Sequence, residues 1–208
     1  SKPAKRLKIG TIVSFGDGSL KAEVTGKYDE GLTHVKLIYD GILMEILDKL
    51  GTMPLPPYIH EKLNDKDRYQ TVYARVFGSS AAPTAGLHFT EELLYEIEKK
   101  GINIVHVTLH VGLGTFNPIE VEDLSKHKME SEEAIIDQAN ADIINKAVEE
   151  NRRICAVGTT VMRTIETSVS SNKKIGPYHG WTNKFIFPPH EFGVANAMIT
   201  NFHTPKST

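Results

Sequence analysis

Three closely spaced prolines divide this chain into two parts of different character. Residues 54–59 read Pro-Leu-Pro-Pro-Tyr-Ile. Because proline fixes φ at about −65° and has no backbone N–H to donate, this stretch fits neither a helix interior nor a central strand. It predicts a stiff, extended connector. We therefore expect a domain boundary here, with a small domain and its connector over residues 1–60 and a larger domain over residues 61–208.

The first part has the pattern of a small β domain. Residues 20–25 and 33–39 alternate apolar and polar side chains, as half-buried strands do. Residues 9–15 form a shorter apolar segment that ends at a glycine-rich turn, residues 16–19. Short strands at this spacing predict a barrel or a sandwich. The apolar residues of 42–50 have helical spacing, so a helix is expected to follow the strands.

The second part alternates helical and strand patterns, which is typical of an α/β domain with a mixed, partly parallel sheet. Thr90 is a good N-cap, and Gly101 is a good stop for the helix that follows. The expected helices cover residues 90–100, 137–150 and 159–168, and the expected strands cover residues 102–110, 153–157, 184–187 and 195–200.

Composition narrows the class of protein. The formal net charge is −2, which does not mark a strongly basic nucleic-acid-binding domain. No stretch approaches the roughly 20 apolar residues of a membrane helix. The single cysteine, Cys155, lies in an apolar run, so a buried and inert thiol is expected. These features suit a reducing compartment, and we expect a cytoplasmic protein.

Two segments in the middle of the chain combine small residues with histidine. Residues 81–90 lead into a helix whose positive end suits an anion, although a tight turn with a packed histidine explains the same pattern. Residues 108–116 follow a strand and contain Gly-x-Gly, a weak nucleotide-loop signal because Asn-Pro follows instead of a helix. The candidate residues are Thr84, Gly86 and His88 in the first segment, and His110, Gly112, Gly114 and Thr115 in the second.

Two further segments lie nearer the end of the chain. In residues 157–166, Gly158 leads into Thr159 and Thr160, whose hydroxyls and free N–H groups suit a carboxylate or a ribose. Arg163 suits an anion, although a surface pair with Glu166 is an equally good interpretation. Residues 199–208 offer further polar groups, although such a terminal loop is usually only solvated; its candidates are Phe202, His203 and Lys206.

A metal centre is not expected. His127, Glu130 and Glu132 are close in sequence, but no second set of ligands matches them. Residues 127–132 are therefore expected to form a polar loop or the start of a helix.

Taken together, these motifs resemble one family, the S-adenosylmethionine:tRNA ribosyltransferase-isomerases of queuosine biosynthesis. The resemblance covers the whole chain, and its motifs occur in the family's order. They are Pro-Leu-Pro-Pro-Tyr-Ile (54–59), Asp-Arg-Tyr-Gln-Thr-Val-Tyr-Ala (67–74), Ala-Ala-Pro-Thr-Ala-Gly-Leu-His-Phe-Thr (81–90), Thr-Leu-His-Val-Gly-Leu-Gly-Thr-Phe (108–116), Val-Gly-Thr-Thr-Val-Met-Arg-Thr-Ile-Glu (157–166) and Ile-Thr-Asn-Phe-His-Thr-Pro-Lys-Ser-Thr (199–208).

The resemblance implies an α/β domain with an inserted small β-barrel domain. It implies that S-adenosylmethionine donates its ribosyl group to 7-aminomethyl-7-deazaguanine at the tRNA wobble position, so that epoxyqueuosine forms while adenine and methionine leave. The partners are tRNA and S-adenosylmethionine, with no metal and no membrane, and a monomer is expected. Family members extend beyond both ends of this sequence, so the chain is expected to be a fragment or to lack some segments.

The chain departs from the family pattern at three places. Glu130 stands where the family usually has histidine, Thr204 where it has leucine, and Pro189-His190 replaces a more usual Gly-Tyr or Pro-Phe.

The resemblance and the residue types together suggest roles. The candidates for acid and base are His88, His110 and His203, ahead of His127. The glycines and hydroxyl residues named above, with Arg163, are candidates for cofactor binding, and Phe202 and Lys206 are candidates for tRNA contact.

Two other functions remain open. A methyltransferase with the same cofactor would need an early strand–Gly-x-Gly loop and an acidic residue after the next strand. An RNA-binding module would need a basic, aromatic barrel surface, for which Tyr28 and Tyr39 give little support.

Overall fold

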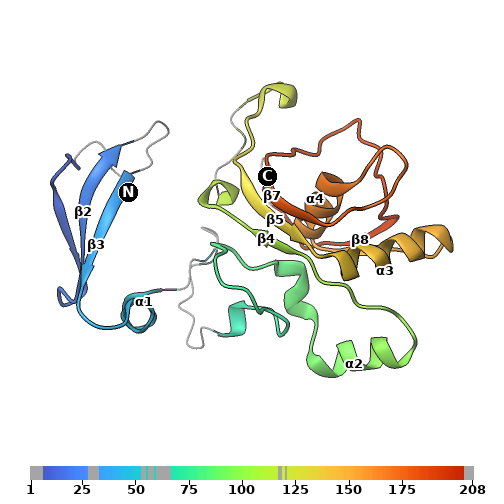
Figure 1. Cartoon of the computed structure of the whole chain (residues 1–208), viewed down its shortest axis with the longest axis horizontal. Coiled ribbons are helices and arrows are strands. Elements are labelled where there is room, and N and C mark those ends of the chain that lie inside the picture. Colours follow the sequence, from blue (N-terminus) through green and yellow to red (C-terminus); the bar gives the residue numbers. More distant parts are fainter. Residues whose placement is uncertain are drawn as a thin grey trace. The chain divides into compact units, whose positions relative to one another are not determined.

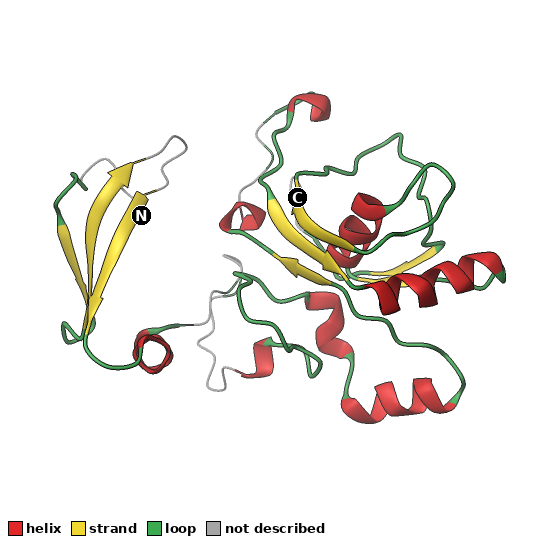
Figure 2. Cartoon of the chain, in the orientation of Figure 1, coloured by secondary structure: helices red, strands yellow, loops and turns green. Residues whose placement is uncertain are grey.

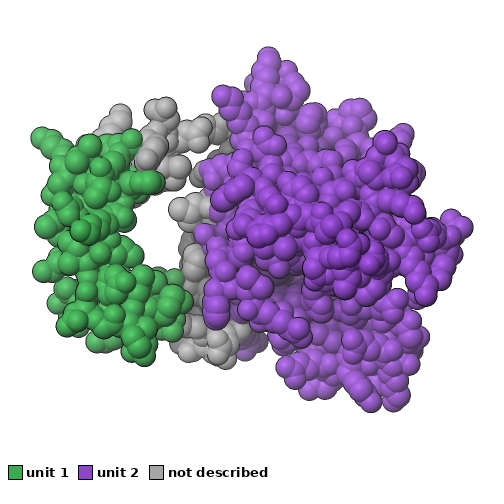
Figure 3. Space-filling model, viewed as in Figure 1, with its two compact units in different colours: residues 1–53 green, residues 54–208 purple. Residues whose placement is uncertain are grey.

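The structure is a computed structural model that describes residues 7–27, 33–52, 55, 59, 67–116, 119 and 121–203. The chain divides into two compact units, residues 1–53 and residues 54–208, which Figure 3 colours separately. The domain division expected from the prolines, at residue 60, stays a prediction.

Unit 1 contains an antiparallel sheet with the strand order β1-β2-β3 (Figure 1). The strands are β1 Ile12–Phe15, β2 Leu20–Lys27 and β3 Thr33–Tyr39, and helix α1 Leu43–Leu50 follows them. Within the described residues, β1 and β3 each pair with β2 and not with each other. A closed barrel requires its edge strands to pair. The expected barrel is therefore not confirmed, and the described sheet is open.

Unit 2 contains the mixed α/β part of the chain (Figure 2). One sheet is antiparallel, with β5 Glu132–Ile136 between β4 Thr108–His110 and β7 Tyr178–Thr182. A second sheet pairs β6 Cys155–Val157 with β8 Ala197–Ile199 in parallel. The prediction of a mixed α/β fold with a parallel component is confirmed.

Two helices of unit 2 begin at a side-chain cap, and the third begins at a glycine. Thr90 Oγ1 accepts from Leu93 N at the start of α2 Glu91–Lys99. Asp137 Oδ1 accepts from Asn140 N, 2.7 Å away, at the start of α3 Gln138–Glu149. Helix α4 Thr159–Ser168 follows Gly158, whose φ of +102° favours glycine. Short 3-10 turns cover Asp67–Tyr69, Thr84–His88, Leu113–Phe116 and Leu124–Lys126.

The hydrophobic core of unit 2 fixes the position of α4. Ile136 of β5, Ile144 of α3 and Ile165 of α4 belong to one buried cluster, and Met162 of α4 packs with Ala156 of β6 in another. Helix α4 contacts β4, β5, β6 and β7. These contacts fix the positions of its side chains relative to the strands.

Several expectations about elements are wrong. Only Thr108–His110 of the expected strand 102–110 is a strand, because the described pairing with β5 begins at Thr108. Residues 184–187 lie outside any strand, and Glu132, expected in a loop, begins β5. Cys155 is exposed, since alternation along β6 buries its neighbour Ala156 instead.

Candidate functional site

A cavity of about 170 Å³ lies where three motif-bearing segments of unit 2 meet. Its walls come from the loop that precedes the turn Thr84–His88, from the segment around β4, and from the end of β6 with α4. Three of the four predicted segments therefore border one cavity. They contribute Ala81 and Pro83, then Thr108, Leu109 and Val111, and finally Val157, Thr160, Val161 and Thr164.

The chemistry of the cavity lining is apolar and hydroxyl-rich. Threonine and serine hydroxyls lie among valine, leucine and alanine side chains, and none of the described lining residues is an aspartate or a glutamate. Arg75 and His106 are the basic residues of the lining, and both are exposed to solvent. The cavity therefore suits a neutral or anionic group.

Tyr73 and His106 supply the aromatic part of the lining. Their ring centroids lie 5.6 Å apart, with planes inclined at 58°. Gly86 leaves room for the phenol, because a Cβ at Gly86 would lie 2.0 Å from Tyr73 Oη and 2.8 Å from Thr71 Cγ2. Partial burial raises the pKa of the Tyr73 phenol. The role of Gly86 here is to leave space for the Tyr73 side chain next to its backbone.

Beside the cavity, Arg163 of α4 forms a buried ion pair with Glu132 of β5. Arg163 Nη1 donates to Glu132 Oε2, and Nη2 donates to the carbonyl oxygens of Glu130 and Thr182, each 3.0 Å away. Burial lowers the pKa of the Arg163 guanidinium, and the Glu132 carboxylate opposes this effect. The expected surface pair of Arg163 with Glu166 is wrong, because both residues are buried and have other partners.

The two glutamates of the 130–132 stretch hold the glycine loop that follows β4. Glu132 Oε1 accepts from Gly112 N at 2.9 Å and from Thr115 Oγ1 at 3.2 Å. Glu130 Oε2 accepts from Gly114 N at 3.1 Å. Since Arg163 fixes Glu132, the ion pair positions this loop relative to α4.

Glu130 and Glu132 are thus engaged by protein groups. Among the described residues, no group of three histidine, cysteine, aspartate or glutamate side chains is arranged to hold a metal ion.

Glu166 of α4 anchors the loop before β8. Its side chain is 2% exposed, its Oε2 lies 3.0 Å from His190 Nε2, and its Oε1 accepts from Gly193 N at 2.9 Å. The histidine at position 190, which departs from the resembled family, therefore has a defined buried partner.

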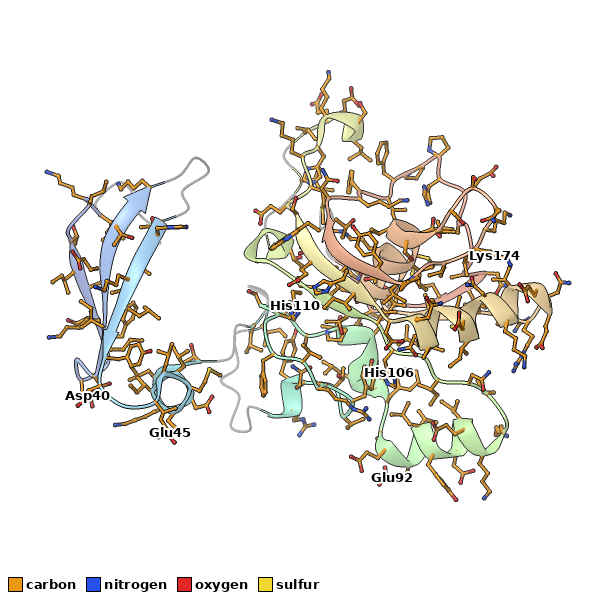
Figure 4. All side chains as sticks on the ribbon, in the orientation of Figure 1. Asp40, Glu45, Glu92, His106, His110 and Lys174 are labelled. Carbon is orange, nitrogen blue, oxygen red and sulfur yellow. The ribbon has the colours of Figure 1, made fainter. Side chains whose placement is uncertain are left out.

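The predicted catalytic histidines lie at different places. Figure 4 labels His110 at the end of β4 and His106 on the segment that leads into it. His110 Nδ1 is buried and has no hydrogen-bond partner within the described part of unit 2. It faces Gly78, where a Cβ would lie 2.7 Å from this nitrogen. His88 and His203 are exposed. None of the three predicted histidines lines the described cavity, whereas His106 does.

The other predicted residues divide between the cavity and the surface. Thr160 lines the cavity, and Gly158 N donates to Ile199 O at 2.8 Å, which ties the fourth predicted segment to the third. Thr159 is exposed and Thr84 is half-buried. Phe202 is 98% exposed. Lys206 lies outside the described residues.

Four residues of this region were not expected from the sequence. Thr71, Tyr73 and His106 line the cavity, and Glu132 is the buried partner of Arg163. The motif at 67–74 contains two of them, so the resemblance carried a signal that residue types alone did not.

No helix in the described part of the chain has both the length and the apolarity needed to cross a membrane.

Comparison with known families gives a match along the whole sequence. A family model described as queuosine biosynthesis protein matches residues 1–208. This chain therefore belongs to the queuosine biosynthesis protein family, and its role lies in queuosine synthesis.

Proposed function

We propose that this protein transfers and isomerises the ribosyl moiety of S-adenosylmethionine onto 7-aminomethyl-7-deazaguanine at the tRNA wobble position. The acceptor amine bonds to the sugar, adenine and methionine leave, and tRNA carrying epoxyqueuosine results. Family membership supports a role in queuosine synthesis. The resemblance of the motifs supports this particular step.

One observation carries the proposal: three of the motif segments border a single cavity next to a loop that a buried ion pair holds in place. Reactions that join two substrates need preorganised groups around a fixed site. Here Glu132 and Arg163 supply the support, and the cavity between β4 and α4 supplies the site.

The role proposed for the histidines is proton transfer, as a general acid or base. His110 is the strongest candidate, because its Nδ1 is buried with no described partner and it is the last residue of β4, directly before the glycine loop. His88 and His203 remain candidates for acid or base. Gly158, Thr159, Thr160 and Thr84 remain candidates for the cofactor's sugar and carboxylate, and Phe202 and Lys206 for tRNA.

The methyltransferase alternative is not favoured. Its nucleotide loop would lead directly into an α-helix. Here the glycine loop after β4 leads into the 3-10 turn Leu113–Phe116, and its N–H groups at Gly112 and Gly114 are already bonded to glutamates.

Product analysis tests the proposal. The protein is incubated with S-adenosylmethionine and tRNA that carries 7-aminomethyl-7-deazaguanine, and the small molecules are separated. We expect free adenine and methionine in amounts that match the modified tRNA. Release of S-adenosylhomocysteine instead would identify a methyltransferase, and no product would identify a binding module.

Histidine variants test the proton-transfer roles. His110→Ala and His88→Ala are expected to fold normally and to lose at least about a hundredfold in turnover, the size of effect typical of general acid–base groups. His179→Ala is the matched control, because His179 is exposed on β7 and pairs only with Glu133 among described residues. A folded variant with normal turnover removes that histidine from the mechanism.

A further inference from the structure

The size of the cavity beside β4 and α4 limits what it can hold. A cavity of about 150 Å³ accepts one benzene ring in a protein core. The volume here, about 170 Å³, is therefore sufficient for one compact planar group. A larger ligand can place one of its parts in this cavity.

The charge of the lining indicates which part of a ligand such as S-adenosylmethionine fits the cavity. No described lining residue carries a negative charge, while the basic lining residues Arg75 and His106 are exposed. A cationic group in such a site would lose hydration without gaining a counter-charge, which is costly. The sulfonium and ammonium groups of S-adenosylmethionine and the aminomethyl group of the acceptor base are thus disfavoured, and a neutral or anionic group remains.

The lining groups match a neutral purine. Val107, Val157 and Val161 offer apolar surface, and the Tyr73 and His106 rings offer faces on which bases stack. The hydroxyls of Thr71 and Thr108 can both donate and accept, as the edge of a purine requires.

We propose that this cavity binds the adenine ring of the ribosyl donor, with Tyr73 and His106 as its aromatic walls. The inference rests on the proposed function for the identity of the donor. It assigns to Tyr73 and His106 a binding role that the motif analysis left unassigned.

Direct binding of free adenine tests the assignment without any turnover. Adenine, and separately 7-aminomethyl-7-deazaguanine, is titrated into the whole protein by calorimetry. Ala74→Phe adds a ring at an exposed position of the lining. Val72→Phe is the matched control, because Val72 is exposed, two residues away and not part of the lining. Tyr73→Ala removes one aromatic wall, and circular dichroism checks the fold of each variant.

We expect adenine to bind, and to bind at least about tenfold more weakly to Ala74→Phe and Tyr73→Ala, as loss of a base-stacking contact produces. Val72→Phe is expected to match the parent protein. Absence of adenine binding, or equal binding by folded Ala74→Phe, would overturn the assignment. Binding of the deazaguanine alone, sensitive to Ala74→Phe, would overturn it in favour of the acceptor base. Adenine binding without adenine release from S-adenosylmethionine would support the site and contradict only the proposed reaction.

Discussion

The missing side chain at Gly86 decides where the phenol of Tyr73 lies. Its φ is not in the left-handed region, so backbone strain does not require glycine there. Space does, because an added Cβ would overlap Tyr73 Oη. The motif alone makes this glycine a candidate for cofactor binding, since a motif cannot show that a tyrosine 13 positions earlier fills the space beside it.

Gly86→Ala is therefore expected to displace Tyr73 and to lower the free energy of unfolding by about 1–3 kcal/mol, the usual effect of overpacking. It is also expected to weaken adenine binding, because the aromatic wall moves. Gly176→Ala is the control, since nothing lies within 4 Å of a Cβ built there. Denaturant unfolding and adenine titration measure both effects, and a Gly86→Ala protein as stable as the control would contradict the packing argument.

The phenol of Tyr73 also predicts a pH effect. Burial raises its pKa, so the folded state favours the protonated form. The stability that this provides is fully present below the ordinary tyrosine pKa of about 10 and is lost as the pH rises through the higher folded value. In a titration of phenolate absorbance, the difference between the parent protein and Tyr73→Phe should therefore appear above pH 10. A difference centred at or below about pH 10 would show an unburied phenol.

At the scale of elements, the ion pair between α4 and β5 has two effects. It compensates two buried charges, and it holds the glycine loop through Glu132 Oε1. Removing one partner leaves the other charge buried and uncompensated, which typically costs about 3–5 kcal/mol. Glu132→Gln and Arg163→Met are expected to lose stability of this order. Glu149→Ala, which breaks the exposed pair with Lys174, should leave unfolding unchanged.

The double variant Glu132→Met/Arg163→Met separates the two effects. Because no charge is then left uncompensated, it should recover much of the stability that each single variant loses. Its adenine release should nevertheless be lower than that of the parent protein, because a methionine at 132 cannot accept from Gly112 N or Thr115 Oγ1. Adenine release equal to that of the parent protein would show that the pair has no positioning role.

The elements that the sequence predicts correctly are those with local signals. Thr90 and Asp137 cap helices within three residues of themselves, and alternation alone marks residues 33–39. Strand β5 was not expected because its first residue, Glu132, is a buried charge whose partners lie 17 to 31 positions away. Strand β7, Tyr178–Thr182, contains a glycine and a histidine and so has no clear strand pattern of its own. It is a strand because it pairs with β5. Sequence patterns do not report such distant partners.

The site residues, too, divide into those that a local motif indicates and those that it does not. Glycine and hydroxyl motifs indicated three walls of the cavity, because loops that approach a ligand need small residues. They did not single out His106, which stands inside a run that looks like an ordinary alternating strand.

At the scale of the whole molecule, the two units differ in how much apolar surface they bury. Both described core clusters belong to unit 2. The described part of unit 1 buries Leu20, Ala22 and Val24 on β2, while Val35 and Ile38 of β3 are 43% and 42% exposed. Burial of apolar area is the main favourable contribution to folding. Unit 1 should accordingly open more readily than unit 2.

Hydrogen exchange on the whole chain tests this difference with two matched strands. Strands β2 and β5 are each the central strand of a three-stranded antiparallel sheet, so their amides have similar hydrogen bonding. Local opening governs exchange, and it costs less where few apolar contacts are buried. We expect β2 amides to exchange at least about tenfold faster than those of β5, a difference of about 1.4 kcal/mol in opening free energy. Equal protection of the two strands would show that burial within unit 1 does not limit its stability.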